Sequence, residues 1–197
     1  MAPKTEEQLQ ELRQERRQKI LEAALELFAL SGFHATSISK IAQKAGISKG
    51  LIYNYFESKD QMLDAIIEGA MQEGDSIINQ GNQQDPGANL KLMIEAFFTE
   101  MKQNQHYWKL VSTLGLRAEF PKINQLIRDR LMAYMEIIKQ MLQQIGIENP
   151  GMEAKVLGAT FDGIALHYLL GGEEYPLEDV KNYLIDKYTK NQAIRDE

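Results

Sequence analysis

Glycine, proline and helix-capping residues divide this chain into segments whose apolar residues recur at helical spacing. No stretch of any length alternates apolar and polar residues as a strand does. The pattern therefore predicts an all-α fold of about nine helices. The first runs from about Leu9 to Phe28 and ends at Ser31-Gly32, a short one lies between Thr36 and Gly46, one of about two turns follows Ser48, one runs from Ser58 to Gly81, and five more span about 88–103, 106–117, 121–145, 152–170 and 177–190.

The charge of the chain is unevenly distributed. The 197 residues carry a net charge of −6, yet residues 12–56 hold seven Lys and Arg against three Asp and Glu. That segment has a balance of +4, which leaves −10 for the rest of the chain. A basic segment on an acidic body suits a protein whose one end meets a polyanion, although so mild an asymmetry also arises by chance.

The remaining composition argues against several classes of protein. There is no cysteine, so neither disulfides nor thiolate metal sites are available, which fits a reducing cytosol. The N-terminus lacks the apolar stretch of a signal peptide, and the most apolar run, 163–172, is too short to span a bilayer. We therefore expect a cytoplasmic protein with no membrane partner.

Two short predicted helices joined by a glycine-containing turn are typical of a helix-turn-helix. In the second of them, Ile52 and Phe56 are four residues apart and face the core, which leaves Lys49 and Tyr53 on the opposite side. Such a helix is the right size for a DNA major groove. Hydroxyl and ammonium groups near the helix starts are typical phosphate donors; these are Thr36, Ser37, Ser48 and Lys59. Alternatively, the hydroxyls only cap helices and the tyrosines only pack.

Residues 20–66, which include "ILEAALELFALSGFHATSISKIAQKAGISKGLIYNYFESKDQML", resemble the N-terminal domain of the tetracycline-repressor (TetR) family of bacterial transcriptional regulators. The resemblance implies contacts with bases or adjacent backbone by Lys49, Gly50, Leu51 and Tyr53, and phosphate contacts by Thr36, Ser37, Ser48, Tyr53, Tyr55 and Lys59. Tyr55 departs from the family pattern, in which histidine is very common. The implied organisation is an extension of the first helix (1–18), a helix-turn-helix domain (19–66) and a helical ligand-binding and dimerisation domain (67–197).

The N-terminal extension carries Arg13, Arg16 and Arg17. These arginines either reach a minor groove or neighbouring phosphates, as basic arms do, or simply solvate an extended helix. We favour the second interpretation because charge runs usually form solvated surface.

The segment 153–172 is apolar on nearly every side of its predicted helix, so it has to be covered all round. Its small residues Gly158, Ala159, Gly163 and Ala165 permit close approach, and the last helix offers an apolar stripe. We expect a homodimer built from these two helices of each copy, as in TetR-like proteins, that binds a palindromic DNA operator. The interface candidates are Gly158, Ala165, Leu169, Val180 and Leu184.

The middle helices hold aromatic, methionine and histidine residues whose spacing is more often that of a core than of a pocket. Members of the TetR family usually bind an inducer there, so the resemblance favours a mostly apolar pocket for a small hydrophobic or aromatic molecule. The pocket candidates are Phe97, Met101, His106, Trp108, Met135, Phe161 and His167. The fourth helix would then transmit ligand binding to the DNA-binding end.

An enzyme is the first competing interpretation. The histidines are scattered, and the chain has neither an H-E-x-x-H motif nor a Gly-rich phosphate loop. We therefore predict no catalysis, no metal and no cofactor. The second competing interpretation is a DNA-organising or scaffold protein that uses the same domain without an inducer.

A repressor is favoured over an activator because a dimer on a promoter blocks polymerase without further contacts.

Overall fold

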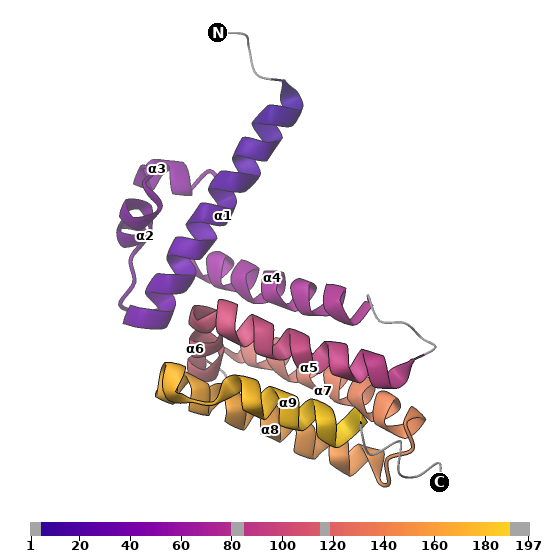
Figure 1. Cartoon of the computed structure of the whole chain (residues 1–197). Coiled ribbons are helices and arrows are strands. Elements are labelled where there is room, and N and C mark those ends of the chain that lie inside the picture. The colour runs from indigo at the N-terminus through magenta and orange to yellow at the C-terminus, as the bar shows by residue number, and fades with distance from the viewer. Residues whose placement is uncertain (1–4, 80–84, 115–118, 190–197) are drawn as a thin grey trace. The chain divides into compact units, whose positions relative to one another are not determined.

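The structure is a computed structural model that describes residues 5–79, 85–114 and 119–189 (Figure 1). Nine α-helices and one short 3-10 helix form the regular structure of these residues, so the predicted all-α fold is confirmed. The helices are α1 (Glu6–Ser31), α2 (Ile38–Ala45), α3 (Lys49–Ile52), α4 (Lys59–Asn79), α5 (Pro86–Gln103), α6 (Gln105–Leu114), α7 (Pro121–Gln144), α8 (Pro150–Gly171), η1 (Gly172–Glu174) and α9 (Leu177–Thr189). The ends predicted at Gly81, 117 and 190 lie outside the described residues.

Local caps explain most of the observed helix ends. Thr5 and Gln8 form a capping box at the start of α1, with mutual bonds of 3.3 and 3.1 Å between side chain and backbone N–H. Ser37 and Ser48 accept bonds of 3.2 Å from backbone N–H groups three residues later, at the starts of α2 and α3. Gly46 ends α2 in the left-handed conformation, with a φ of 68°.

The third helix is shorter than predicted. Regular α-helix ends at Ile52, and the N–H groups of Asn54 and Tyr55 bond to carbonyls three residues earlier. The chain therefore continues as tight turns to Phe56, whose N–H bonds back to Ile52 O at 3.0 Å. The expected two turns become one α-helical turn and a turn-rich tail.

The chain forms two compact units, Met1–Ala70 and Met71–Glu197. In the first unit α1 packs on α2, and the fully buried side chains include Ile20, Ile41, Ile52 and Phe56. Burial of Ile52 and Phe56 agrees with the side of the third helix that the sequence assigned to the core. This packing leaves the opposite side of α3 on the surface.

In the second unit α5 packs on α9 and α7 packs on α8 (Figure 1). A single apolar core joins these helices and receives Trp108 from α6. Its buried members include Leu90, Ile94, Phe98, Met101, Ile138, Leu142, Leu157, Phe161, Ile164, Leu184 and Tyr188. No helix of the described residues has the length and hydropathy to cross a bilayer.

Candidate nucleic-acid interface and ligand core

The outer side of α3 and its tail carries polar and aromatic groups that are exposed on the surface of the first unit. Ser48, Lys49 and Gly50 are exposed, and half of the Tyr53 surface is accessible, at 50%. Within the part of the chain that the structure describes, Lys49 makes no hydrogen bond or ion pair. A Cβ atom at Gly50 would meet nothing within 4 Å, so no packing within the protein requires glycine there. These groups are accessible to an external partner.

Two of the other predicted phosphate donors, Thr36 and Lys59, make side-chain contacts within the first unit. The Thr36 side chain is only 1% exposed, and its hydroxyl donates to the carbonyls of Gly32 and Leu27, at 2.9 and 3.2 Å. The Lys59 ammonium donates to Phe33 O at 2.8 Å and to Thr36 O at 2.6 Å. Both side chains hold the loop between α1 and α2, so the fold accounts for both residues without a phosphate.

Ser37 and Tyr55 remain on the accessible surface. Ser37 is exposed at the start of α2, and Tyr55 is partly exposed in the tail of α3. The guanidinium of Arg13 lies 6.0 Å from the centre of the Tyr55 ring, and that of Arg17 lies 5.0 Å from the centre of the Phe56 ring. Cation–π contacts thus hold two arginines of α1 beside the helix-turn-helix, where the sequence left solvation and DNA contact as alternatives.

The basic side chains of α2 are engaged within the first unit. Lys40 donates to Ala35 O at 3.2 Å, and Lys44 forms an ion pair with Glu26 at 2.6 Å. Of the three lysines of α2 and α3, Lys49 is therefore the one whose ammonium is not engaged by another described residue.

Three of the predicted pocket residues, from three different helices, meet in an aromatic cluster. The ring of Phe97 stacks on Phe161 with centroids 4.4 Å apart, and it lies edge-on to Trp108 at 5.3 Å. Met101 is fully buried in the same core, and Met135 packs against it. The indole nitrogen of Trp108 is buried and has no hydrogen-bond acceptor among the described residues.

The two histidines proposed for the pocket do not join this cluster. His106 and His167 are both exposed, and the His167 ring instead lies 6.0 Å from the ring of Tyr175. The pocket assignment of both histidines came from the family resemblance, which does not specify the directions of their side chains.

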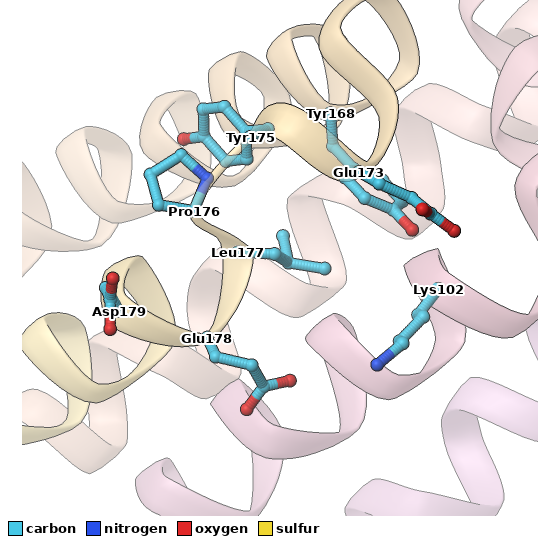
Figure 2. A pocket seen from close by; sticks show the side chains of 8 residues that line it. All are labelled: Lys102, Tyr168, Glu173, Tyr175, Pro176, Leu177, Glu178 and Asp179. Carbon is cyan, nitrogen blue, oxygen red and sulfur yellow. The ribbon is translucent and has the colours of Figure 1, made fainter.

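A surface hollow of about 380 Å³ lies where α8 leads through η1 into α9, with Lys102 of α5 on its far side (Figure 2). It is lined by Lys102, Tyr168, Glu173, Tyr175, Pro176, Leu177, Glu178 and Asp179. None of the predicted pocket residues is among them. Because half of the lining is ionisable as Lys, Asp or Glu, the hollow does not match the apolar pocket that was predicted.

The outward face of α8 differs from the predicted dimer face. Gly158, Ala165 and Leu184 are buried within the chain, which argues against the interface role predicted for their side chains. Leu169 is only partly exposed, and partly buried Val180 packs against the core. The outward apolar residues instead form one stripe, here called the α8 seam: Met152, Val156, Ala159, Gly163, Leu166 and Leu170.

The first unit matches a known protein family. Residues 20–66 match the family model described as "Bacterial regulatory proteins, tetR family", which spans the exposed α3 surface. The chain belongs to the TetR family. It is accordingly a DNA-binding transcriptional regulator with a helix-turn-helix, not an enzyme, as the sequence predicted.

Relatives of this TetR-family protein extend over most of its length. It is 25% identical over 177 residues to the fatty acid metabolism regulator protein of Bacillus subtilis (strain 168), covering 85% of this chain and 91% of the relative. It is 26% identical over 181 residues to the HTH-type transcriptional regulator BetI of Yersinia pestis (strain Pestoides F), covering 86% and 90%. The structure of FadR from Bacillus subtilis in complex with stearoyl-CoA has a TM-score of 0.68 at 23% identity, over 87% of this chain and 97% of that one.

A polar contact between α4 and α7 of this TetR-family regulator was missed by the sequence analysis. Arg130 donates to Asp75 at 2.6 Å, and a Cβ atom at Gly74 would lie 2.6 Å from the hydroxyl oxygen of Tyr134. Burial raises the pKa of Tyr134, and the carboxylate of Asp75 raises it further. The only signal in the sequence was Gly74, a glycine inside a helix. A glycine does not indicate which residue packs against it, here Tyr134, 60 residues later.

Neighbouring Tyr107 is another ionisable group in the second unit. Its burial raises its pKa to about 12, so the phenol stays neutral at physiological pH.

Across residues 5–79, 85–114 and 119–189, no group of three His, Cys, Asp or Glu side chains is arranged to hold a metal ion.

Proposed function

We propose that this regulator contacts its operator through Ser37, Ser48, Lys49, Gly50, Leu51, Tyr53 and Tyr55. The observation that carries the proposal is the α3 surface, where an unpaired lysine, an open glycine and a half-exposed tyrosine have no role in the fold. Lys49 and the hydroxyls suit phosphate oxygens, and Leu51 suits a thymine methyl group. Gly50 lets the backbone approach a base or a sugar.

The direct test is operator binding by alanine variants, with fragments first selected from the organism's own genome. Lys49→Ala and Tyr53→Ala should each weaken binding about 10-fold, which corresponds to roughly 1–2 kcal/mol for a lost contact. Lys109→Ala is the matched control, since Lys109 is an exposed lysine of α6 in the other unit. Unchanged affinity in both α3 variants, with folding intact, would remove the assignment.

We also infer that the regulator acts as a homodimer and that a second copy covers the α8 seam. Successive members of the seam are separated by four, three, four, three and four residues, which is the spacing of a helix that pairs with another helix. Leu170 is 79% exposed and Leu166 is 50% exposed, which is costly for a monomer in water. A two-fold dimer also presents two α3 helices to two half-sites of a palindrome about one DNA turn apart.

Sedimentation equilibrium tests the dimer. Leu166→Glu places a carboxylate in the seam and should shift the protein toward monomers, with a parallel loss of operator binding. Leu131→Glu is the control, because Leu131 is an exposed leucine of α7 outside the seam. If both variants sediment as the parent does, the seam is not the subunit interface.

For the regulatory step, we propose a repressor that releases its operator, in the cytoplasm, when a small apolar molecule binds the second unit. The aromatic cluster of Phe97, Trp108 and Phe161 supports an apolar ligand. The similarity to a fatty acid metabolism regulator, and to FadR in complex with stearoyl-CoA, makes long-chain acyl-CoA the first class to test. α4 contributes residues to both units and is tied to α7 by Asp75 and Arg130, so it is our candidate transmitter.

A release experiment separates this proposal from a DNA-organising protein without an inducer. Operator complexes are titrated with stearoyl-CoA, and free CoA serves as the control for the nucleotide part. Dissociation by stearoyl-CoA alone supports a ligand-released repressor. Binding to many unrelated fragments that no ligand alters would favour the organising role.

A further inference from the structure

The indole N–H of Trp108 is a buried donor without an acceptor among the residues that the structure describes. Burying such a donor costs free energy, and a phenylalanine or leucine at the same place would avoid that cost. An unsatisfied group of this kind is a place where a bound molecule can supply the acceptor.

The surroundings of Trp108 limit what that acceptor is. The ring contacts Phe97 edge-on at 5.3 Å and Tyr107 at 6.0 Å, and the side chain packs against the apolar core of α5, α7, α8 and α9. The side chains that surround the indole are apolar or aromatic, and the Tyr107 phenol is held neutral by burial. Burying an anion among such side chains is costly, so the better match is an uncharged oxygen such as a carbonyl.

A contact between α7 and α8 indicates where space for a ligand can open. The Met135 side chain lies over Gly158, with its Cε 2.6 Å and its Sδ 2.8 Å from the position that a Cβ atom would take. Gly158 precedes Phe161 by about one helical turn, so this methionine borders the aromatic cluster. Methionine is unbranched and flexible, and its departure would free a path along α8 without a backbone shift.

We propose that Trp108 donates its indole N–H to the carbonyl oxygen of an acyl ligand, whose hydrocarbon chain lies against Phe97 and Phe161 and takes the place of Met135 over Gly158. The inference rests on the proposed function, since it specifies the contact by which an apolar ligand is held in the second unit.

The chain has one tryptophan, which makes the test unusually direct. Protein labelled with ¹⁵N in the indole ring gives a single side-chain cross-peak, which should move downfield in the proton dimension when stearoyl-CoA is added. Replacing the tryptophan by benzothienylalanine during expression exchanges N–H for sulfur and keeps the shape of the ring. This protein should bind stearoyl-CoA about 10-fold more weakly by calorimetry, since a buried carbonyl loses its donor.

Two controls keep the interpretation specific. The substituted protein should bind operator as the parent does when no ligand is present, and its thermal stability should be equal or higher, because an unsatisfied donor has been removed. Lower stability would mean that the N–H is satisfied inside the core, for example by a ring face, and would overturn the inference. Tyr175→Phe, in the surface hollow, should leave acyl-CoA affinity unchanged.

The outcomes separate the inference from the function on which it rests. If stearoyl-CoA releases operator equally well from parent and substituted protein and the cross-peak stays in place, the role of Trp108 is wrong while the repressor stands. If the cross-peak moves and affinity falls but operator stays bound, the site is correct and the regulatory proposal fails. No binding of stearoyl-CoA by calorimetry overturns the acyl site.

Discussion

Replacing Lys59 by methionine distinguishes a residue that holds the fold from one that holds DNA. Methionine keeps the apolar stem of the side chain and removes its charge. In the structure the ammonium donates to Phe33 O and Thr36 O, at 2.8 and 2.6 Å, and lies 4.6 Å from the centre of the Phe33 ring. All three contacts are internal to the first unit, so their loss should appear as instability.

The magnitude follows from those contacts. Hydrogen bonds to a charged group contribute about 1.5–3 kcal/mol, and a cation–π contact near the surface adds about 0.5–1 kcal/mol. Lys59 is partly solvated, and water can reach the vacated carbonyls in the variant. The expected loss of folding free energy is therefore only about 2–3 kcal/mol. If all 197 residues unfold together, the midpoint of thermal unfolding should fall by about 4–12 °C.

Lys49→Met is the matched variant, because Lys49 is an exposed lysine with no internal partner among the described residues. It should leave thermal stability unchanged and flatten the plot of log operator affinity against log salt by about 0.9, which is the contribution of one phosphate. Lys59→Met should leave that slope intact, measured well below its unfolding midpoint. A stable Lys59→Met protein with a flattened slope would refute the structural assignment and restore the phosphate contact.

Three further variants test separate parts of the structure. Gly50→Ala should raise stability by up to about 1 kcal/mol, because the site is open and alanine favours helix, while operator affinity falls; urea titration and anisotropy measure the two. Arg130→Ala should lower stability by about 0.5–1 kcal/mol in urea, the contribution of its partly exposed pair with Asp75. The hydrogen bond from Lys187 lowers the pKa of Glu153, so that pair stabilises the fold above the ordinary carboxyl pKa and less as the pH falls through the lowered one. Glu153→Gln should therefore be less stable than the parent at pH 7, and thermal scans should show the difference narrowing below about pH 4.

The sequence predicted best what depends on neighbouring residues. The start of α3 follows from Ser48, and the end of α2 follows from Gly46, because each cap acts on backbone groups within about four residues. The inward side of α3 was also correct, since Ile52 and Phe56 are separated by about one helical turn. Such features need no knowledge of the rest of the fold.

Hydrogen-bond partners that lie far along the chain were not predicted. Lys59 has the composition and position of a phosphate ligand, but its acceptors are carbonyls 23 and 26 residues away. Thr36 has the position of a cap, yet its hydroxyl donates to Leu27 O, nine residues earlier. Only the packing of the loop between α1 and α2 decides these roles, and no local pattern records it.

The buried and exposed faces of α8 could not be told apart from local sequence either. The exposed face supports the proposal that a second copy of the chain covers it. A helix that is apolar on every side gives no periodic signal, so sequence alone could not separate Gly158, which faces Met135, from Gly163, which meets nothing within 4 Å. A glycine inside a helix costs up to about 1 kcal/mol relative to alanine. Within the described residues nothing offsets that cost at Gly163, whereas two seams that cross at Ala159 and Gly163 would bring the two helices into close contact. The exposed leucines at 166 and 170 would then be buried by the same approach.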